Sequence, residues 1–169
     1  CAQARALIAG ALAGLEPEDG TTGRCHSLPT WYHPSVGPEL ADLANCSGLD
    51  QASVIRLHSA HEYVVFAIGF APGFAFMGLV DERLAKPRLS TPRKRIAAGS
   101  VGIADRQTAV YPSVSPGGWN LLGRSPTRLF DLAIGSYSLL HPGDRVRFEP
   151  IEHAEFVRLG GDDTPQEHE

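Results

Sequence analysis

Apolar positions recur at helical spacing near the start of the chain and gather in short runs after it. The apolar residues of segment 2–15 that share one helix face are Leu7, Ile8, Ala11, Leu12 and Leu15. This spacing and the Ala-rich composition predict a helix there, because Ala has the highest helix propensity. Residues 16–24 then read as a linker.

Two more helices are expected in the first third of the chain, after a strand over residues 25–32. Pro38 suits the first position of a helix, which predicts one beginning at that residue. Asp50 is a good N-cap, and Leu49 is placed to pack on Val54 as a hydrophobic staple. The helix that Asp50 starts should run to about His58.

From residue 61 onward the pattern changes to short runs rich in β-branched and aromatic residues. Residues 61–70 predict a buried strand. Shorter strands, separated by turn residues, are expected at 96–104, 108–111, 119–123, 128–130 and 145–148. Many short strands at this spacing predict a closed barrel or a sandwich, with helices covering its ends. Residues 160–169 are polar, lack a packing face and are expected to be a frayed tail.

Composition narrows the class of protein. With 169 residues, 43% of them hydrophobic, the chain can form one main core. A net charge of -4 argues against a nucleic-acid binder, and no apolar run approaches the length of a membrane span. Three cysteines without CxxC spacing indicate neither a disulfide framework nor a zinc site, which fits a cytoplasmic protein. The chain starts at Cys1 rather than Met, so we expect a processed start or a missing N-terminal portion.

Segment 69–126 is unusually rich in glycine and proline, with eight Gly and six Pro in 58 residues. Such density, about twice average usage, predicts shaped loops. The same segment carries five aromatic residues: Phe70, Phe74, Phe76, Tyr111 and Trp119. Two interpretations fit them: they line a binding surface, or they fill a small β-barrel whose corners the glycines turn.

The same segment overlaps a basic stretch that could bind an anion. No Asp or Glu occurs between Arg83 and Ala104, whereas six cations do: Arg83, Lys86, Arg88, Arg93, Lys94 and Arg95. A guanidinium can pair with a carboxylate or phosphate through two hydrogen bonds. Arg93 is the strongest candidate, and a solvated loop accounts for most of the others.

Residues for catalysis are less clear. His58 could be a general acid or base, or a structural histidine at a helix end. Backbone N–H groups of Gly99 and Ser100, or of the glycines in the Ser115, Gly117, Gly118 and Trp119 loop, could hold an anion. Gln107 could hydrogen-bond an amide or carboxylate. A nucleophile elbow at Ser100 fails, because Ala98 stands where Gly is required, and no histidine spacing predicts a metal site.

Three motifs carry a family resemblance: GFAPGFAFMG, PRLSTPRKRIAAGSVGIADRQTAVYP and SPGGWNLLGRSP. They resemble the family that holds the 5-oxoprolinase B subunit and Kip-type sporulation-kinase inhibitors, also labelled allophanate hydrolase subunit 1, over residues 28–151. The resemblance implies a mainly β, cyclophilin-like β-barrel with flanking helices over residues 25–158 and a polar tail over 159–169. It implies that residues 1–24 are the last helix and linker of a truncated α/β domain. Ala97 and Ala109 depart from the family's usual Pro and Gly.

The resemblance also implies a function. The chain would be a non-autonomous subunit that works with a homologous C-type barrel and an A-type subunit to open 5-oxoproline to glutamate. ATP would be bound by the assembled complex rather than by this chain alone. Arg93, Gln107 and the amides of Gly117 and Gly118 would orient a small carboxylate or acyl phosphate, with Phe74 facing the ligand or the partner barrel.

Three other functions stay open at this point. One is a regulatory protein that inhibits a sensor histidine kinase, and another is a subunit of an allophanate hydrolase or a urea carboxylase-like carboxyltransferase. Prolyl isomerase activity is a weaker hypothesis, since no catalytic motif accompanies the fold analogy. Fold alone cannot separate these functions.

Overall fold

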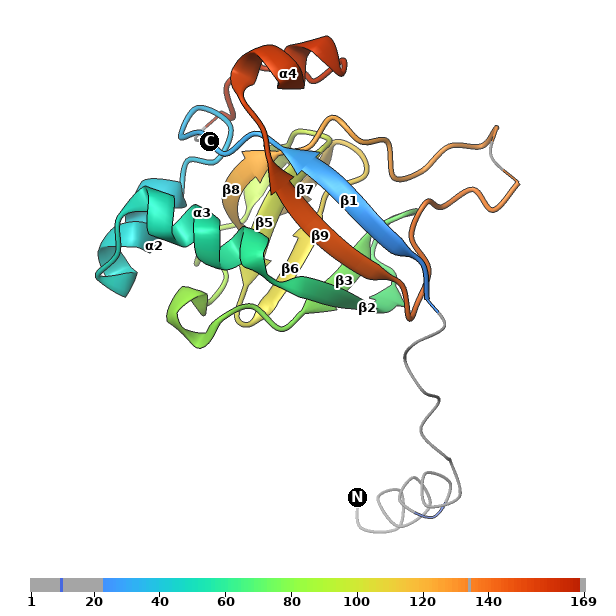
Figure 1. The fold of residues 1–169 in the computed structure, drawn as a ribbon, viewed down its shortest axis with the longest axis horizontal. Helices are drawn as coiled ribbons and strands as arrows, with labels where there is room; N and C mark the ends of the chain where they lie inside the picture. The colour runs from blue at the N-terminus through green and yellow to red at the C-terminus, as the bar shows by residue number, and fades with distance from the viewer. Residues whose placement is uncertain (1–9, 11–22, 134, 168–169) are drawn as a thin grey trace.

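The computed structural model describes residue 10, residues 23–133 and residues 135–167, and these are mainly β (Figure 1). The strands are β1 (Cys25–Thr30), β2 (Glu62–Ile68), β3 (Ala75–Gly78), β4 (Arg93–Ile96), β5 (Ser100–Ala104), β6 (Gln107–Val110), β7 (Ser115–Gly117), β8 (Asn120–Arg124) and β9 (Arg145–Pro150). The helices are α2 (Leu40–Ser47), α3 (Gln51–Ala60), α4 (His153–Arg158) and the 3-10 turn η1 (Glu82–Leu84). The helix expected in residues 2–15 lies outside the described residues, apart from residue 10.

Seven of these strands form one sheet that closes into a barrel. Their order is β1-β9-β2-β3-β6-β5-β8. β1 and β9 pair in parallel, and all other neighbours are antiparallel. The two outer strands meet where Trp31 and Arg124 exchange backbone hydrogen bonds, each 2.9 Å long. Closure by these two bonds leaves little unpaired edge, as in other small barrels.

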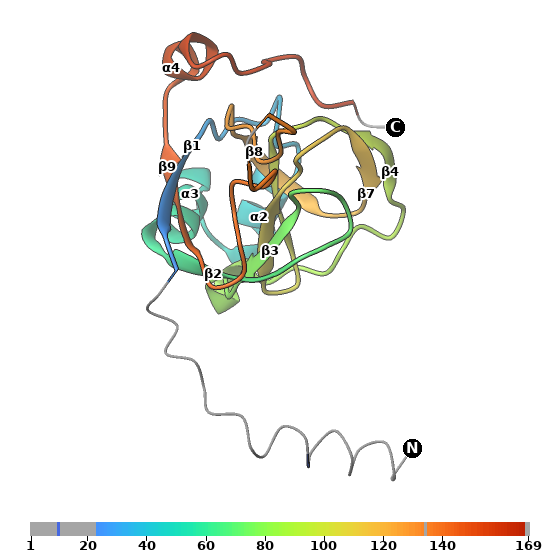
Figure 2. The same ribbon diagram turned by 90° about the vertical axis from the view of Figure 1, so that its right-hand side faces the viewer.

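The remaining two strands, β4 and β7, form a separate antiparallel ribbon beside the barrel (Figure 2). The expected strand over 96–104 is therefore two strands, one in each sheet. Between them the chain turns at Gly99, which has φ 80°. A Cβ at this position would lie 2.2 Å from the Ser125 carbonyl oxygen, so the turn requires glycine.

Helices α2 and α3 lie together on one side of the barrel (Figure 1). Asp50 caps α3 as predicted, its side chain accepting a hydrogen bond from the Ser53 N–H at 2.7 Å. α2 begins at Leu40, two residues later than predicted from Pro38. Glu39 occupies the N-cap position of α2, but its side chain points away from the helix amides to other partners.

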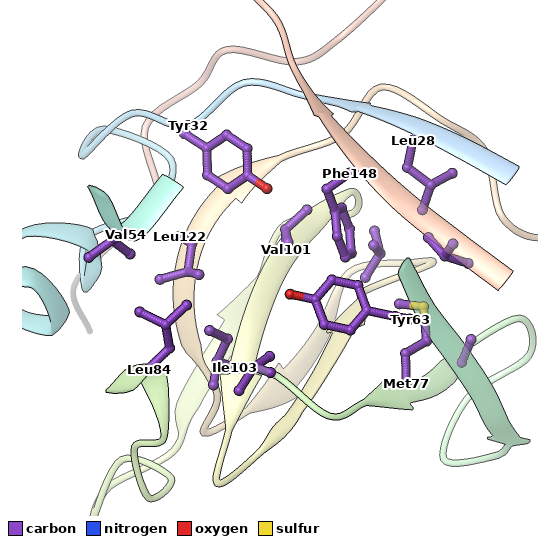
Figure 3. Packing of buried hydrophobic residues seen from close by; sticks show 14 of the residues in the cluster. Leu28, Tyr32, Val54, Tyr63, Met77, Leu84, Val101, Ile103, Leu122 and Phe148 are labelled. Carbon is purple, nitrogen blue, oxygen red and sulfur yellow. The ribbon is translucent and has the colours of Figure 1, made fainter. Parts of the chain in front are cut away.

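The barrel interior holds the larger of two hydrophobic clusters. Tyr32, Tyr63 and Phe148 extend into the space between the strands (Figure 3). β2 alternates between buried and exposed positions: Tyr63 and Val65 face the interior, whereas Val64 and Phe66 face outward. The predicted buried strand is therefore buried on one face only, because β2 has no further layer packed on its outer face among the described residues.

Three of the shorter strands also differ from the prediction. Residues 128–130 do not form a strand, and only Phe130 makes an isolated bridge, to Ser138. Two short strands, β3 and β7, were not predicted. Proline and glycine lie just before β3 and within β7, and sequence rules assign such segments to loops.

The C-terminal segment is docked rather than frayed. After α4 the chain crosses the top of the barrel toward the β4–β7 ribbon (Figure 2). We call residues 162–167 the C-terminal strap. The side chain of Gln166 is buried and accepts a hydrogen bond from the Ala97 N–H at 3.0 Å while donating to the Arg95 carbonyl at 2.8 Å. These long-range contacts could not be predicted from the polar, acidic sequence of this segment.

Within the described residues, none of the helices combines the length and apolar character that crossing a membrane requires.

Candidate functional site

Four of the five aromatic residues of segment 69–126 belong to the second hydrophobic cluster, next to the β4–β7 ribbon: Phe74, Phe76, Tyr111 and Trp119. The Phe74 ring meets Tyr111 and Trp119 edge-on, at centroid distances of 5.3 and 5.6 Å. All three are buried, whereas Phe70 is 65% exposed. Phe74, Tyr111 and Trp119 therefore fill space, which agrees with the packing interpretation, and of these four rings Phe70 alone is exposed enough to contact another molecule.

Arg93 lies at the start of β4 and is the charged centre of this region. Its guanidinium forms an ion pair with Glu39 through Nη2 and is only 7% exposed. Glu39 also accepts a hydrogen bond from the Leu121 N–H at 2.9 Å, so it is fixed from two sides. Among the described residues, Nε and Nη1 of Arg93 have no hydrogen-bond partner. Part of a buried guanidinium thus remains able to bind an acceptor.

Two further groups lie near Arg93. Burial raises the pKa of Tyr111 to about 12, although a backbone hydrogen bond from Trp119 and the charges of Arg88 and Arg93 act in the opposite direction. The Tyr111 hydroxyl therefore keeps its proton at neutral pH. Arg88 lies over the Trp119 ring, with its guanidinium carbon 5.8 Å from the ring centroid.

The β7 glycines are positioned beside these groups. Gly117 pairs with Arg93 and Ser115 with Ile96 across the ribbon. A Cβ at Gly117 would lie 2.3 Å from the Tyr111 hydroxyl oxygen, so this close approach needs glycine. The Gly118 carbonyl accepts a hydrogen bond from the Leu89 N–H at 2.7 Å. The structure therefore brings together five of the predicted site residues: Phe74, Arg93, Gly117, Gly118 and Trp119.

The Gly99–Ser100 turn does not offer the predicted free amides. The Gly99 N–H donates to the Tyr111 carbonyl at 2.7 Å, and the Ser100 N–H donates to the Ala97 carbonyl at 3.3 Å. Both donors are used within the fold, so the expectation that they hold an anion was wrong. The Ser100 hydroxyl is different, because it is buried and has no partner among the described residues.

His58 and Gln107 lie apart from Arg93. His58 is inside the barrel, 2.7 Å from the Tyr32 hydroxyl through Nδ1 and 2.9 Å from the Thr108 hydroxyl through Nε2. Burial lowers its pKa to about 3, so it stays neutral where a general acid or base would have to titrate. Gln107 lies at the start of β6, half-buried, at the opposite end of that strand from Tyr111.

Glu39 and Arg124 are the charged residues that sequence reasoning missed. Both are buried, and both touch predicted site residues: Glu39 pairs with Arg93, and Arg124 pairs with Ser100 across β5 and β8. An acidic residue after a Gly-Pro pair gave no hint of its partner 54 residues away. In the described part of the chain, His, Cys, Asp and Glu form no group of three or more suited to a metal ion.

With this geometry established, comparison with known proteins identifies the family. Residues 1–140 match the family of the carboxyltransferase domain, subdomain C and D. The chain belongs to this family. It is similar to proteins named as the B subunit of 5-oxoprolinase, from Escherichia coli (47% identity over 136 residues, 80% of this chain) and from Bacillus subtilis (42% over 145 residues, 86% of this chain). The chain spans about three fifths of the length of these relatives.

Solved structures agree with the fold. A conserved uncharacterized protein from Pyrococcus horikoshii is 44% identical and superimposes with a TM-score of 0.76, covering 79% of this chain and 62% of that one. Urea carboxylase from Kluyveromyces lactis is 20% identical, with a TM-score of 0.70, over 96% of this chain and 17% of that one. The second likeness concerns the fold alone. It shows that the barrel can be one part of a much longer chain.

Proposed function

We propose that this chain is part of a 5-oxoprolinase-type enzyme, which opens the lactam of 5-oxoproline to give glutamate at the expense of ATP. The observation that carries the proposal is its 47% identity to the Escherichia coli protein named as the B subunit of 5-oxoprolinase. In this proposal the chain works with a homologous C-type barrel and an A-type subunit. ATP is bound by the assembled complex rather than by this chain alone.

The role proposed for Arg93 is to hold the substrate carboxylate. Glu39 occupies Nη2 of the guanidinium, and Nε and Nη1, which point to different sides, are left without a partner among the described residues, so that either one can donate to an anion. Such hydrogen bonds are strong when water is excluded, and Arg93 is almost fully buried. Holding the carboxylate would fix the lactam carbonyl relative to groups supplied by the other subunits, which is a contribution of position rather than of bond-making.

The outer face of β2 is suited to contact with the proposed C-type barrel. Val64 and Phe66 point outward from this strand, and Leu79, just past the β2–β3 pairing, is also exposed. Apolar side chains on an unpaired sheet face often mark an interface. A substitution of Phe66 with Glu should therefore weaken the heteromer, as measured by co-purification with the C-type partner.

The test is reconstitution. The full chain is combined with its C-type and A-type partners, and ATP-dependent release of glutamate from 5-oxoproline is measured. Arg93→Lys keeps a positive charge opposite Glu39 but loses the two free donors. We expect it to lower kcat/KM by about 100-fold, the cost of one charged hydrogen bond. Lys94→Ala, at the adjacent exposed position, is the control and should retain activity.

Arg93→Ala is less informative, because it would leave the buried Glu39 carboxylate without its counter-charge and could unfold the site. If Arg93→Lys turns over 5-oxoproline normally in an intact assembly, Arg93 does not hold the carboxylate. If no combination of subunits releases glutamate while the chain blocks autophosphorylation of a sensor histidine kinase, the enzyme proposal fails in favour of the regulatory one. The carboxyltransferase alternative is supported by the description of the matched family and by likeness of fold, neither of which identifies a substrate.

A further inference from the structure

Arg124, at the end of β8, is a second buried guanidinium, and it lies under the C-terminal strap. It is 1% exposed. Its Nη1 donates to the carbonyl oxygens of Asp162 and Thr164, at 2.6 and 2.8 Å. Unlike Arg93, it has no carboxylate among the partners of its guanidinium in the described residues.

The other edge of this guanidinium is unused. Nε and Nη2 of Arg124 are buried and have no hydrogen-bond partner among residues 23–133 and 135–167. These two nitrogens point in parallel and form the edge that binds a carboxylate through two hydrogen bonds. Burying these two donors without a hydrogen-bond partner costs free energy. This indicates that an acceptor occupies this edge in some state of the protein.

A hydroxyl group adds a third unused polar atom. Ser100 and Arg124 face each other across the β5–β8 pair, so both side chains lie on the same face of the sheet. The Ser100 Oγ is also buried without a partner. Two N–H donors and one O–H donor therefore belong to side chains that are neighbours on one face of the sheet, and no acceptor in the described chain serves any of them.

The space beside Arg124 is hollow. A cavity of about 240 Å³ is lined on one side by Arg95, Ala97 and Arg124 and on the other by the strap. The strap brings two acids to this cavity, Asp162 and Glu167. With the strap in place the charges of the two arginines and the two acids balance. When the strap leaves, two positive charges remain.

We propose that Arg124, Ser100 and Arg95 form a binding site for a small carboxylate, and that the C-terminal strap covers this site in the unliganded chain. The carboxylate lies on the Nε–Nη2 edge of Arg124, with Ser100 donating a third hydrogen bond. Strap docking opposes binding, because the strap forms one wall of the cavity and its acids repel an anion. This site is separate from Arg93 and does not depend on the enzymatic proposal.

A substitution of Gln166 should shift the equilibrium between strap docking and carboxylate binding. Its side chain holds the strap through Arg95 and Ala97 but does not touch the proposed carboxylate donors. Gln166→Ala should loosen the strap and so strengthen carboxylate binding. Ser100→Ala should weaken it, because one donor is lost. The two variants therefore move the affinity in opposite directions, which a simple loss of stability would not do.

The experiment is a titration of the full chain with acetate at constant ionic strength, following the ¹⁵N and ¹H signals of the Arg124 Nε–H group by NMR. We expect a saturable shift in the unaltered chain. Gln166→Ala should bind acetate about fivefold more tightly and Ser100→Ala about fivefold more weakly, each the effect of about one hydrogen-bonded contact. Arg128→Lys, at an exposed arginine, is the control and should bind acetate as the unaltered chain does.

Arg124→Lys should abolish saturable binding, judged from the amide signals of Ala97 and Ala98, since lysine lacks the two-donor edge. If that variant does not fold, the opposite responses of Gln166→Ala and Ser100→Ala still decide the matter. No saturable shift, or equal affinities in both variants, overturns the proposal and leaves water as the partner of Arg124. Tighter binding of inorganic phosphate than of acetate overturns the assignment to carboxylates.

Discussion

The two buried arginines of this barrel are neutralised in different ways. Arg93 has a carboxylate of its own, Glu39, carried by the turn before α2. Within the described part of the chain, the Arg124 guanidinium binds only backbone carbonyls of the C-terminal strap. A carboxylate side chain is fixed by the core around it, whereas we propose that the strap can leave. The comparison teaches that burial alone does not define an anion site: what matters is which donors of the guanidinium are left without an internal acceptor.

Removal of Arg93 should have the largest effect. Arg93→Met leaves Glu39 buried without its counter-charge and should lower the free energy of unfolding by about 3–5 kcal/mol. Urea unfolding followed by circular dichroism measures this. Adding Glu39→Gln, which removes the charge but keeps an oxygen for the Leu121 N–H, should restore most of the loss. A loss below about 1 kcal/mol in the single variant would mean that the pair is solvated.

Removal of Arg124 should cost less. In Arg124→Met the carbonyls of Asp162 and Thr164 lose their donor, but both residues are exposed and can turn to water. We expect a loss of about 2 kcal/mol, typical of hydrogen bonds to a charged group. Arg128→Met, at an exposed arginine, is the matched control with a change within about 0.5 kcal/mol. Equal losses for Arg93→Met and Arg124→Met would erase the distinction between the two sites.

His58 is a third buried titratable group, and unlike the two arginines it stays neutral in the folded protein. Because burial lowers its pKa from 6.5 to about 3, the unfolded chain binds a proton in this range that the folded chain does not. The contribution of His58 to stability is therefore complete above pH 6.5 and is lost as the pH falls, by up to about 1.4 kcal/mol per unit. Unfolding measured between pH 4 and 7 should show this slope reduced in His58→Gln. An unchanged slope would contradict the neutral assignment.

Loss of the strap anchor should have the smallest effect on global stability. Gln166→Ala removes two hydrogen bonds, to Arg95 and Ala97, and should cost about 1 kcal/mol. The change should be local, with faster amide hydrogen exchange at Ala97 and Gln166 and unchanged exchange in β5 and β6. Glu167→Ala, an exposed neighbour, serves as the control. Exchange that quickens throughout the barrel would show that the strap is part of the core rather than a separable cover.

Local rules predicted much of the barrel. The β-branched and aromatic run of β2, the Asp50 cap of α3 and the positions of β1, β6, β8 and β9 follow from patterns within a few residues of each site. Of the candidate site, the sequence singled out Arg93, which the structure buries beside Gly117 of β7; its role in binding an anion stays a prediction. These are features that neighbouring residues decide.

Pairings between distant segments could not be predicted in the same way. Nothing local links Glu39 with Arg93, 54 residues apart, or Arg124 with carbonyls 38 and 40 residues further on. The same holds for the amides of Gly99 and Ser100, which backbone pairing consumes, and for His58, which becomes neutral only because the barrel closes around it.

The sequence by itself determined where the chain extends, turns and begins its helices, because those preferences are set by each residue's own backbone and its near neighbours. It also determined the family, through motifs of contiguous residues. Only the tertiary structure decided which charges are buried, which of them have an internal partner and which keep an unused edge, since desolvation and pairing depend on groups that the fold brings together from far along the chain.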